Sequence, residues 1–199
     1  KMVAFSLTPI LIVLPSVFYL ATYTSWDKRH IVENNQKASG AALATFEYFA
    51  ARPEERPANT RLIFAAFSGR QNGNSGAAAF VKQHWGRDDL LINPAVIDVE
   101  AITGGDFTVP EYDAAAFKAS GADAAAKLKA ALDAANIAYV STGKKLASGS
   151  DHTFSAFTAK QIEAATLAVR ENTTDAIDFN ESETITSVIK VLIETVKRL

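Results

Sequence analysis

The chain contains no cysteine. Thiolate chemistry, disulfide bonds and cysteine-ligated metal sites are therefore excluded for it. It also has no excess of charge of either sign, since 20 Lys and Arg stand against 22 Asp and Glu, for a net charge of −2. A chain this close to neutral carries no electrostatic footprint for nucleic acid, and no polybasic run points to a lipid surface.

The composition that is present is that of an ordinary folded protein. The 199 residues are 48% hydrophobic and 21% charged. That length allows one domain with a substantial core and hardly allows two. We therefore expect a single domain over residues 1–199.

An apolar run at residues 2–21 needs its own interpretation. Its length and low charge suit a membrane span or the core of a signal peptide. Pro9 and Pro15 would break a single helix there, and the run is rich in β-branched and aromatic residues. We predict strands at about 3–7 and 10–22, with a membrane or signal segment as the alternative. The chain begins at Lys1 and not at Met, which leaves room for residues upstream.

Residues 61–83 have the pattern of a strand, a turn and a helix. Residues 62–67 are unbroken apolar, as in a strand covered on both faces. The Gly- and Asn-rich residues 68–73 predict a turn, and a helix is expected to start near Asn74. Open α/β sheets place ligand crevices at the carboxyl ends of their strands, so this turn is a candidate site.

Other periodic segments complete an alternation of helices and strands. Helices are predicted from Asn34 to about Ala51, over 111–135 with an interruption at Gly121, and from about Asn180, with Asn180 and Glu183 as a capping pair. Strands are predicted at 17–22, 90–101, 137–140 and 162–169. Expected core positions in the last two helices are Phe117, Leu128, Leu132, Ile185, Val188, Ile189, Leu192, Ile193 and Val196. His30 is expected in a charged, solvated loop at 27–30.

Three motifs follow one another in the spacing of a known family. They are LIFAAFSG-x-x-x-G-x-x-G from residue 62, SDHTF from Ser150, and DAID from Asp175 before the closing helix. From about residue 17 onward the chain resembles the zinc aminopeptidases of the aminopeptidase Y, bacterial leucyl aminopeptidase and glutamate carboxypeptidase type. The resemblance implies a three-layer α/β/α sandwich with a mixed, mainly parallel sheet. It also favours an extracytoplasmic or membrane-associated location.

The positions that hold two zinc ions in that family are altered in this chain. By the resemblance they correspond to Thr22, Gln36, Gln71, Glu100 and Glu171, with Thr24 and Asp98 at accompanying positions. Threonine is a poor zinc ligand, and a neutral amide between two dications cannot offset their repulsion. Arg70 stands where the family has its general base, and a guanidinium cannot accept a proton. At Glu100 the family has a metal-binding carboxylate, and among these positions only this one still carries a carboxylate where the family has one.

Asp151 and His152 are the acidic residue and the histidine of the SDHTF motif. Adjacent residues on an extended chain point in opposite directions, so the two cannot share a substrate proton directly. By the resemblance they belong to the rim of the pocket and bind no metal.

These substitutions predict a catalytically inactive aminopeptidase-like domain. Dinuclear zinc hydrolysis needs anionic or imidazole ligands on both metals and a base for the bridging water. We expect no cofactor, and a role in binding a protein or peptide or as a scaffold in a larger assembly, comparable to nicastrin, nicalin and the transferrin receptor ectodomain. The N-terminal run offers a route to membrane association.

Two alternatives stay open. One is a metal-dependent exopeptidase with rearranged zinc ligands, drawn from Asp98, Glu100, Asp151, His152 and Glu171. The other is a pocket that binds a peptide or amino-acid end without cutting it.

Overall fold

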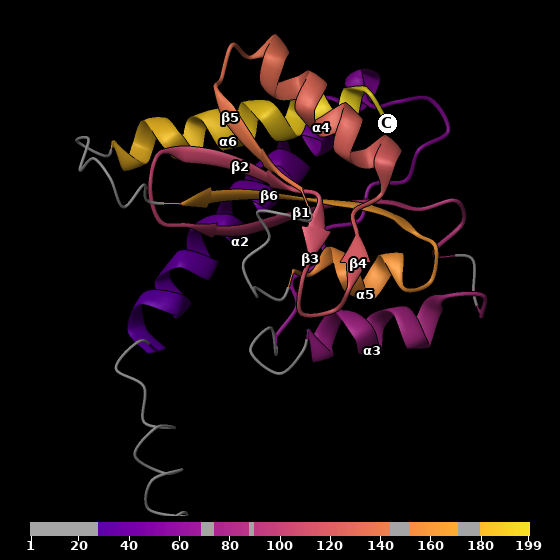
Figure 1. Cartoon of the computed structure of the whole chain (residues 1–199). Coiled ribbons are helices and arrows are strands. Elements are labelled where there is room, and N and C mark those ends of the chain that lie inside the picture. The colour runs from indigo at the N-terminus through magenta and orange to yellow at the C-terminus, as the bar shows by residue number, and fades with distance from the viewer. Residues whose placement is uncertain (1–27, 69–73, 88–89, 144–151, 171–179) are drawn as a thin grey trace, which may run out of the picture. The chain divides into compact units, whose positions relative to one another are not determined.

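A computed structural model describes residues 28–68, 74–87, 90–143, 152–170 and 180–199 (Figure 1). The chain divides into two compact units, Lys1–Glu33 and Asn34–Leu199. The predicted strands within residues 3–22, and the alternative membrane or signal segment, lie outside the described residues. Among the helices that are described, none is both long and apolar enough to cross a membrane. The single-domain interpretation stays a prediction.

The Asn34–Leu199 unit has an α/β fold with a mixed, mainly parallel sheet of four strands packed against helices. The strand order is β1 (Ala95–Ile102), β6 (Glu163–Arg170), β2 (Asp106–Pro110) and β5 (Tyr139–Thr142). The β1/β6 and β2/β5 pairs are parallel, and β2 pairs with β6 in the antiparallel direction. The predicted sheet type and the predicted strands at β1 and β6 are confirmed.

One face of the sheet carries the main core. Strand residues such as Ile97 and Val99 point to this face because side chains alternate along a strand. Three helices supply the other half of the core: α2 (Lys28–Ala51), α4 (Ala122–Ala134) and α6 (Glu181–Lys197). The buried core residues include Ala38, Ala41, Ile102, Phe107, Val109, Leu128, Leu132, Leu167, Val188 and Leu192. The predicted core roles of Leu128, Leu132, Val188 and Leu192 are therefore confirmed.

The opposite face packs on two shorter helices, α3 (Ser75–His84) and α5 (Phe154–Thr158), which lie across the sheet from α4 and α6 in Figure 1. Val96 of β1 and Ala164 of β6 contact this second cluster. Its largest buried side chains are Phe154 and Phe157. The polar residues of β1 and β6, described below, also point to this face, since they alternate with the residues of the main core.

The predicted helix over 111–135 is wrong in its first half. Residues 111–120 hold a small hairpin of β3 (Tyr112–Asp113) and β4 (Lys118–Ala119), and α4 starts after Gly121. The Asp113 carboxylate accepts hydrogen bonds from the backbone of Ala115 and Ala116, which favours a turn over a helix. Phe117, predicted in the core, has φ 55° and is 79% exposed at the tip of the hairpin.

The predicted strand at residues 62–67 is also wrong. Residues 61–68 form no regular element, and Ile63, Ala65 and Ala66 are exposed. An apolar run adopts strand geometry only where a neighbouring backbone completes its ladder, and hydropathy alone does not provide that partner.

Three further boundaries differ. The helix predicted from Asn34 begins earlier, at Lys28, so His30 lies in α2 and not in a loop. The strand predicted at 137–140 is shifted to β5, and β2 was not predicted. In α6 the buried side is rotated toward Thr184, Val191 and Thr195, with Ile193 and Val196 only half-buried. The predicted cap is present, since the Asn180 side chain accepts from the Glu183 backbone at 3.3 Å.

A polar clamp ties the end of α2 to the end of α6. Glu55, in the short η1 helix (Pro53–Glu55), accepts a hydrogen bond from Tyr48 at 2.6 Å and pairs with Lys197. The hydrogen bond from Lys197, and after it the one from Tyr48, lowers the pKa of Glu55. The Glu55 carboxylate in turn raises the pKa of Tyr48 and of Lys197. The Arg52 guanidinium lies over the Tyr48 ring, 4.4 Å from its centroid.

Gly121 is required by the contact between α4 and β6. Its backbone N–H donates to Ala164 O at 2.7 Å, and an added Cβ would lie 2.4 Å from Glu163 Oε2 and 2.6 Å from Ala164 N. We expect Gly121→Ala to lower the free energy of unfolding by about 1–3 kcal/mol, measured by urea denaturation.

Gly40 provides the matched control, because it lies within α2 and a Cβ there would meet nothing within 4 Å. Gly40→Ala should raise the free energy of unfolding by up to about 1 kcal/mol. Equal effects of the two substitutions would contradict the assigned contact.

Candidate functional site

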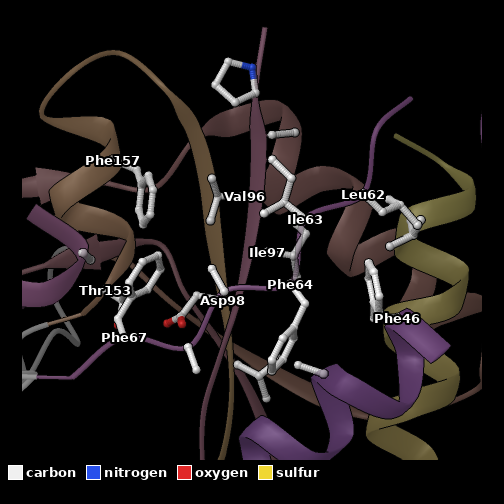
Figure 2. A pocket seen from close by; sticks show the side chains of 18 of the residues that line it. Phe46, Leu62, Ile63, Phe64, Phe67, Val96, Ile97, Asp98, Thr153 and Phe157 are labelled. Carbon is white, nitrogen blue, oxygen red and sulfur yellow. The ribbon is translucent and has the colours of Figure 1, made fainter. Parts of the chain in front are cut away.

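A cavity of about 860 Å³ lies along the outer edge of β1 in the Asn34–Leu199 unit. Its walls are β1, residues 59–68, and parts of α2 and α6. Figure 2 shows side chains that line this cavity, among them Ile63 and Phe64 from residues 59–68 and Val96, Ile97 and Asp98 from β1. The size falls in the range of about 300–1,000 Å³ that small-molecule and cofactor sites occupy.

Apolar side chains form most of the cavity. At one end of the cavity, Phe46, Leu62 and Phe64 lie toward α2 and α6 (Figure 2). At the other end, Phe67 and Phe157 lie toward α5. Apolar side chains that remain exposed gather at its mouth, since Phe46, Ile63 and Ile92 are 38%, 44% and 70% exposed. Such a surface suits an apolar ligand or an apolar stretch of polypeptide.

One end of the cavity is polar. Asp98 points its carboxylate toward Thr153 and Phe67 in Figure 2. The Thr166 hydroxyl, from the paired position on β6, donates to Asp98 Oδ2 at 3.2 Å. Asn74 and Thr153 line the same end and are buried, with the Thr153 hydroxyl 3.4 Å from Asn74 Oδ1. Asp98 is thus a charged group at the polar end of the cavity.

A buried ionic cluster lies next to that polar end, two residues further along β1. Glu100 and His152 are each 4% exposed, and Glu100 Oε1 is 2.8 Å from His152 Nδ1. Arg170 Nη2 donates to the other carboxylate oxygen, Oε2, at 3.4 Å. The His152 ring stacks on Phe154 with centroids 5.5 Å apart. Burying a carboxylate is costly unless it is paired, and Glu100 has a partner on each oxygen.

The backbone of His152 is fixed from three sides. Its N–H donates to Asp113 Oδ2 at 2.9 Å. Its carbonyl accepts from Asn74 Nδ2 at 3.2 Å and from the Ser155 hydroxyl at 2.8 Å. Asn74 itself has φ 54°, a left-handed conformation that asparagine tolerates better than most residues. The backbone of His152 is therefore held by contacts to Asp113, Asn74 and Ser155, while Glu100 and Phe154 contact its ring.

The structure describes four of the residues singled out from the sequence. Glu100 and His152 form one cluster, Asp98 lies on the same face of β1, and Gln36 is an exposed residue of α2. The other positions, Thr22, Thr24, Arg70, Gln71, Asp151 and Glu171, lie outside the described residues. The pocket-rim role of Asp151 and His152 stays a prediction.

Four residues of the site were missed by the sequence interpretation: Asn74, Asp113, Thr166 and Arg170. Thr166 interrupts the apolar run of β6 and Arg170 ends it, and these two polar positions were the available signal. Asp113 had no comparable signal, since one acidic residue among alanines is also typical of a helix surface. Among the residues that the structure describes, no group of three or more His, Cys, Asp or Glu is arranged to hold a metal ion.

Models of known protein families give no match to this chain. A search of curated proteins also finds no matching sequence.

Removing the His152 side chain should destabilise the fold, because Glu100 would lose a buried partner. We expect His152→Ala to lower the free energy of unfolding by about 3 kcal/mol or more in chemical denaturation. His84→Ala is the matched control, since the half-buried His84 ring contacts Phe80 on α3 and its loss should cost only about 1 kcal/mol.

The double variant His152→Ala with Glu100→Gln completes the experiment. If the contact between Glu100 and His152 is what matters, neutralising Glu100 should recover part of the lost stability. Additive losses, or a His152→Ala effect no larger than that of His84→Ala, would show that the pair contributes nothing specific.

Proposed function

We propose that this chain is a catalytically inactive aminopeptidase-like domain that acts as a binding or scaffold module in a larger assembly. Its fold in this proposal is the three-layer α/β/α sandwich implied by the resemblance. The observation that carries the proposal is the state of Glu100, the position at which the resemblance places a metal-ligating carboxylate. Its two oxygens are engaged by His152 and Arg170.

Arg170 opposes metal binding at Glu100. A guanidinium keeps its positive charge at every relevant pH. A dication approaching Glu100 would have to displace Arg170 and would be repelled by it at short range. The positive charge that a metal would bring to this carboxylate is supplied by the Arg170 guanidinium, which supports a structural role for Glu100.

The arrangement of elements supports the same proposal. β1 and β6 are adjacent and parallel, so their carboxyl ends meet at one edge of the sheet, where Glu100 and Arg170 contact each other. Open α/β sheets place their ligand sites at this edge. Helices α2, α3 and α6 are present at segments where the sequence predicted helices.

The cavity beside β1 supports a binding function. Its apolar walls suit an apolar side chain or segment, and Asp98 can accept hydrogen bonds from a cationic group such as an amino terminus. We therefore propose a protein or peptide as the partner.

The first experiment measures metal content and hydrolysis. We expect purified protein, incubated with zinc and dialysed, to retain less than stoichiometric zinc and to leave aminoacyl chromogenic substrates uncleaved. Stoichiometric zinc with chelator-sensitive turnover that falls in Glu100→Gln would instead establish a metal-dependent exopeptidase with rearranged ligands.

The second experiment measures peptide binding by calorimetry and thermal shift, with short peptides that carry an apolar first residue and a free amino terminus. We expect binding that weakens about tenfold or more in Asp98→Asn, because a charge-assisted hydrogen bond becomes a neutral one. Asp106→Asn is the matched control, since Asp106 is an exposed residue of β2 that does not line the cavity. A flat response to every peptide would remove the binding part of the proposal.

A further inference from the structure

The β3–β4 hairpin displays an aromatic side chain to solvent. Phe117, in the turn between its two strands, is 79% exposed, more than any other large hydrophobic side chain in the described part of the chain. The hairpin forms a two-stranded sheet of its own (Figure 1). Single exposed hydrophobic residues are common on protein surfaces, so this exposure alone does not indicate a contact.

The backbone of Phe117 is strained. Its φ is 55°, in the left-handed region that asparagine tolerates and that a bulky aromatic residue adopts at a cost. Four of the six described non-glycine residues with positive φ are asparagines. A ring that is 79% exposed recovers little of the cost by packing within its own chain. Strained residues of this kind gather at binding and catalytic sites, and a contact outside the chain would explain an aromatic residue here.

The hairpin holds Phe117 in a fixed position. The buried Asp113 carboxylate accepts from the backbone of Ala115 and Ala116 on one oxygen and from the backbone of His152 on the other. The turn is therefore fastened both within itself and to the rest of the fold. An aromatic side chain that is pre-organised in this way loses little conformational freedom on binding, and such side chains dominate the energy of protein interfaces.

The cavity beside β1 is complementary to this hairpin tip. Its walls are mostly apolar, and the exposed Ile63 and Ile92 lie at its mouth. A volume of about 860 Å³ leaves room for an aromatic ring and the alanines of the turn. Its polar end carries the Asp98 carboxylate, and the exposed Lys118, of opposite charge, directly follows Phe117. Phe117 does not line the cavity of its own chain, so a contact between the two needs a second molecule.

We propose that the cavity binds the hairpin tip of a second copy of this chain, with Phe117 between the apolar walls and Lys118 paired with Asp98. This inference rests on the proposed binding function and names its partner. One aromatic anchor makes a small interface, so the association is transient, with a dissociation constant in the micromolar to millimolar range. Because tip and cavity are different surfaces, the assembly is a dimer or a larger ring or chain of copies.

Sedimentation equilibrium of the whole chain over a range of concentrations measures this association. We expect the average mass to rise with concentration. Phe117→Asn should weaken the association about tenfold or more, because the apolar area of the ring is no longer buried. Val140→Ala is the matched control, since Val140 is an exposed residue of β5 that does not line the cavity, and it should associate as the unmodified chain does.

The stability of Phe117→Asn separates a contact residue from a structural one. Asparagine tolerates the left-handed backbone at this position, so the variant should unfold at the same or a higher urea concentration than the unmodified chain. A lower unfolding midpoint would show that the ring supports its own fold, and it would overturn the proposal.

Mixing two variants tests whether the tip meets the cavity. Ile63→Arg places a cation at the cavity mouth, where it blocks entry and repels Lys118. Neither this variant nor Phe117→Asn should self-associate, but a mixture of the two should form a complex, because one keeps its cavity and the other its tip. Lys118→Glu, on the exposed tip, replaces Phe117→Asn or Ile63→Arg if either fails to fold, since it should weaken association by repelling Asp98. A monomeric unmodified chain, association that no substitution weakens, or a mixture that stays monomeric would overturn the proposal.

Peptide binding distinguishes this inference from the proposed function. The cavity of Phe117→Asn is unchanged, so the variant should bind the peptides described above as tightly as the unmodified chain does. Those peptides should also dissociate the complex of copies, since both occupy one cavity. If peptides bind and the self-association is unaffected, the binding function stands and the second copy is not the partner.

Discussion

The buried carboxylate of Glu100 is the constraint on which the site depends. A charge inside the fold must be paired, and its partners come from distant parts of the chain: His152 from the turn before α5 and Arg170 from the end of β6. To hold His152 in place the fold uses further polar contacts to its backbone, from Asn74, Asp113 and Ser155. A polar cluster of this kind also fixes where α3, α5 and the β3–β4 hairpin lie against the sheet.

The two faces of the sheet have different roles as a result. The face under α2, α4 and α6 is filled by aliphatic side chains and contributes most of the buried apolar surface. The face under α3 and α5 combines a small aromatic cluster with Asp98, Thr166 and Glu100. The aliphatic core therefore lies on one side of the sheet, and the polar groups of the candidate site lie on the other. Such a separation agrees with the proposed binding role.

The elements that the sequence predicted correctly have strong periodic or capping signals. The apolar stretches of β1 and β6, the helix from Asn34 and the Asn180 cap of α6 all appear close to their expected positions. The errors arose where hydropathy did not decide the local structure. Asp113 closes a turn with the backbone two and three residues further on, and residues 62–67 have no strand partner in the part of the chain that the structure describes. In the site, the importance of Glu100 could be inferred from a motif. Its pairing with Arg170 could not, because 70 residues separate the two in sequence.

The two carboxylate oxygens of Asp113 bind different parts of the fold. Oδ1 closes the turn of the hairpin, and Oδ2 holds the backbone of His152. The hairpin cannot unravel without releasing the histidine, and the histidine cannot shift without disturbing the hairpin tip that displays Phe117. A contact made at that exposed aromatic ring is therefore energetically linked to the ionic centre of the domain, through one side chain.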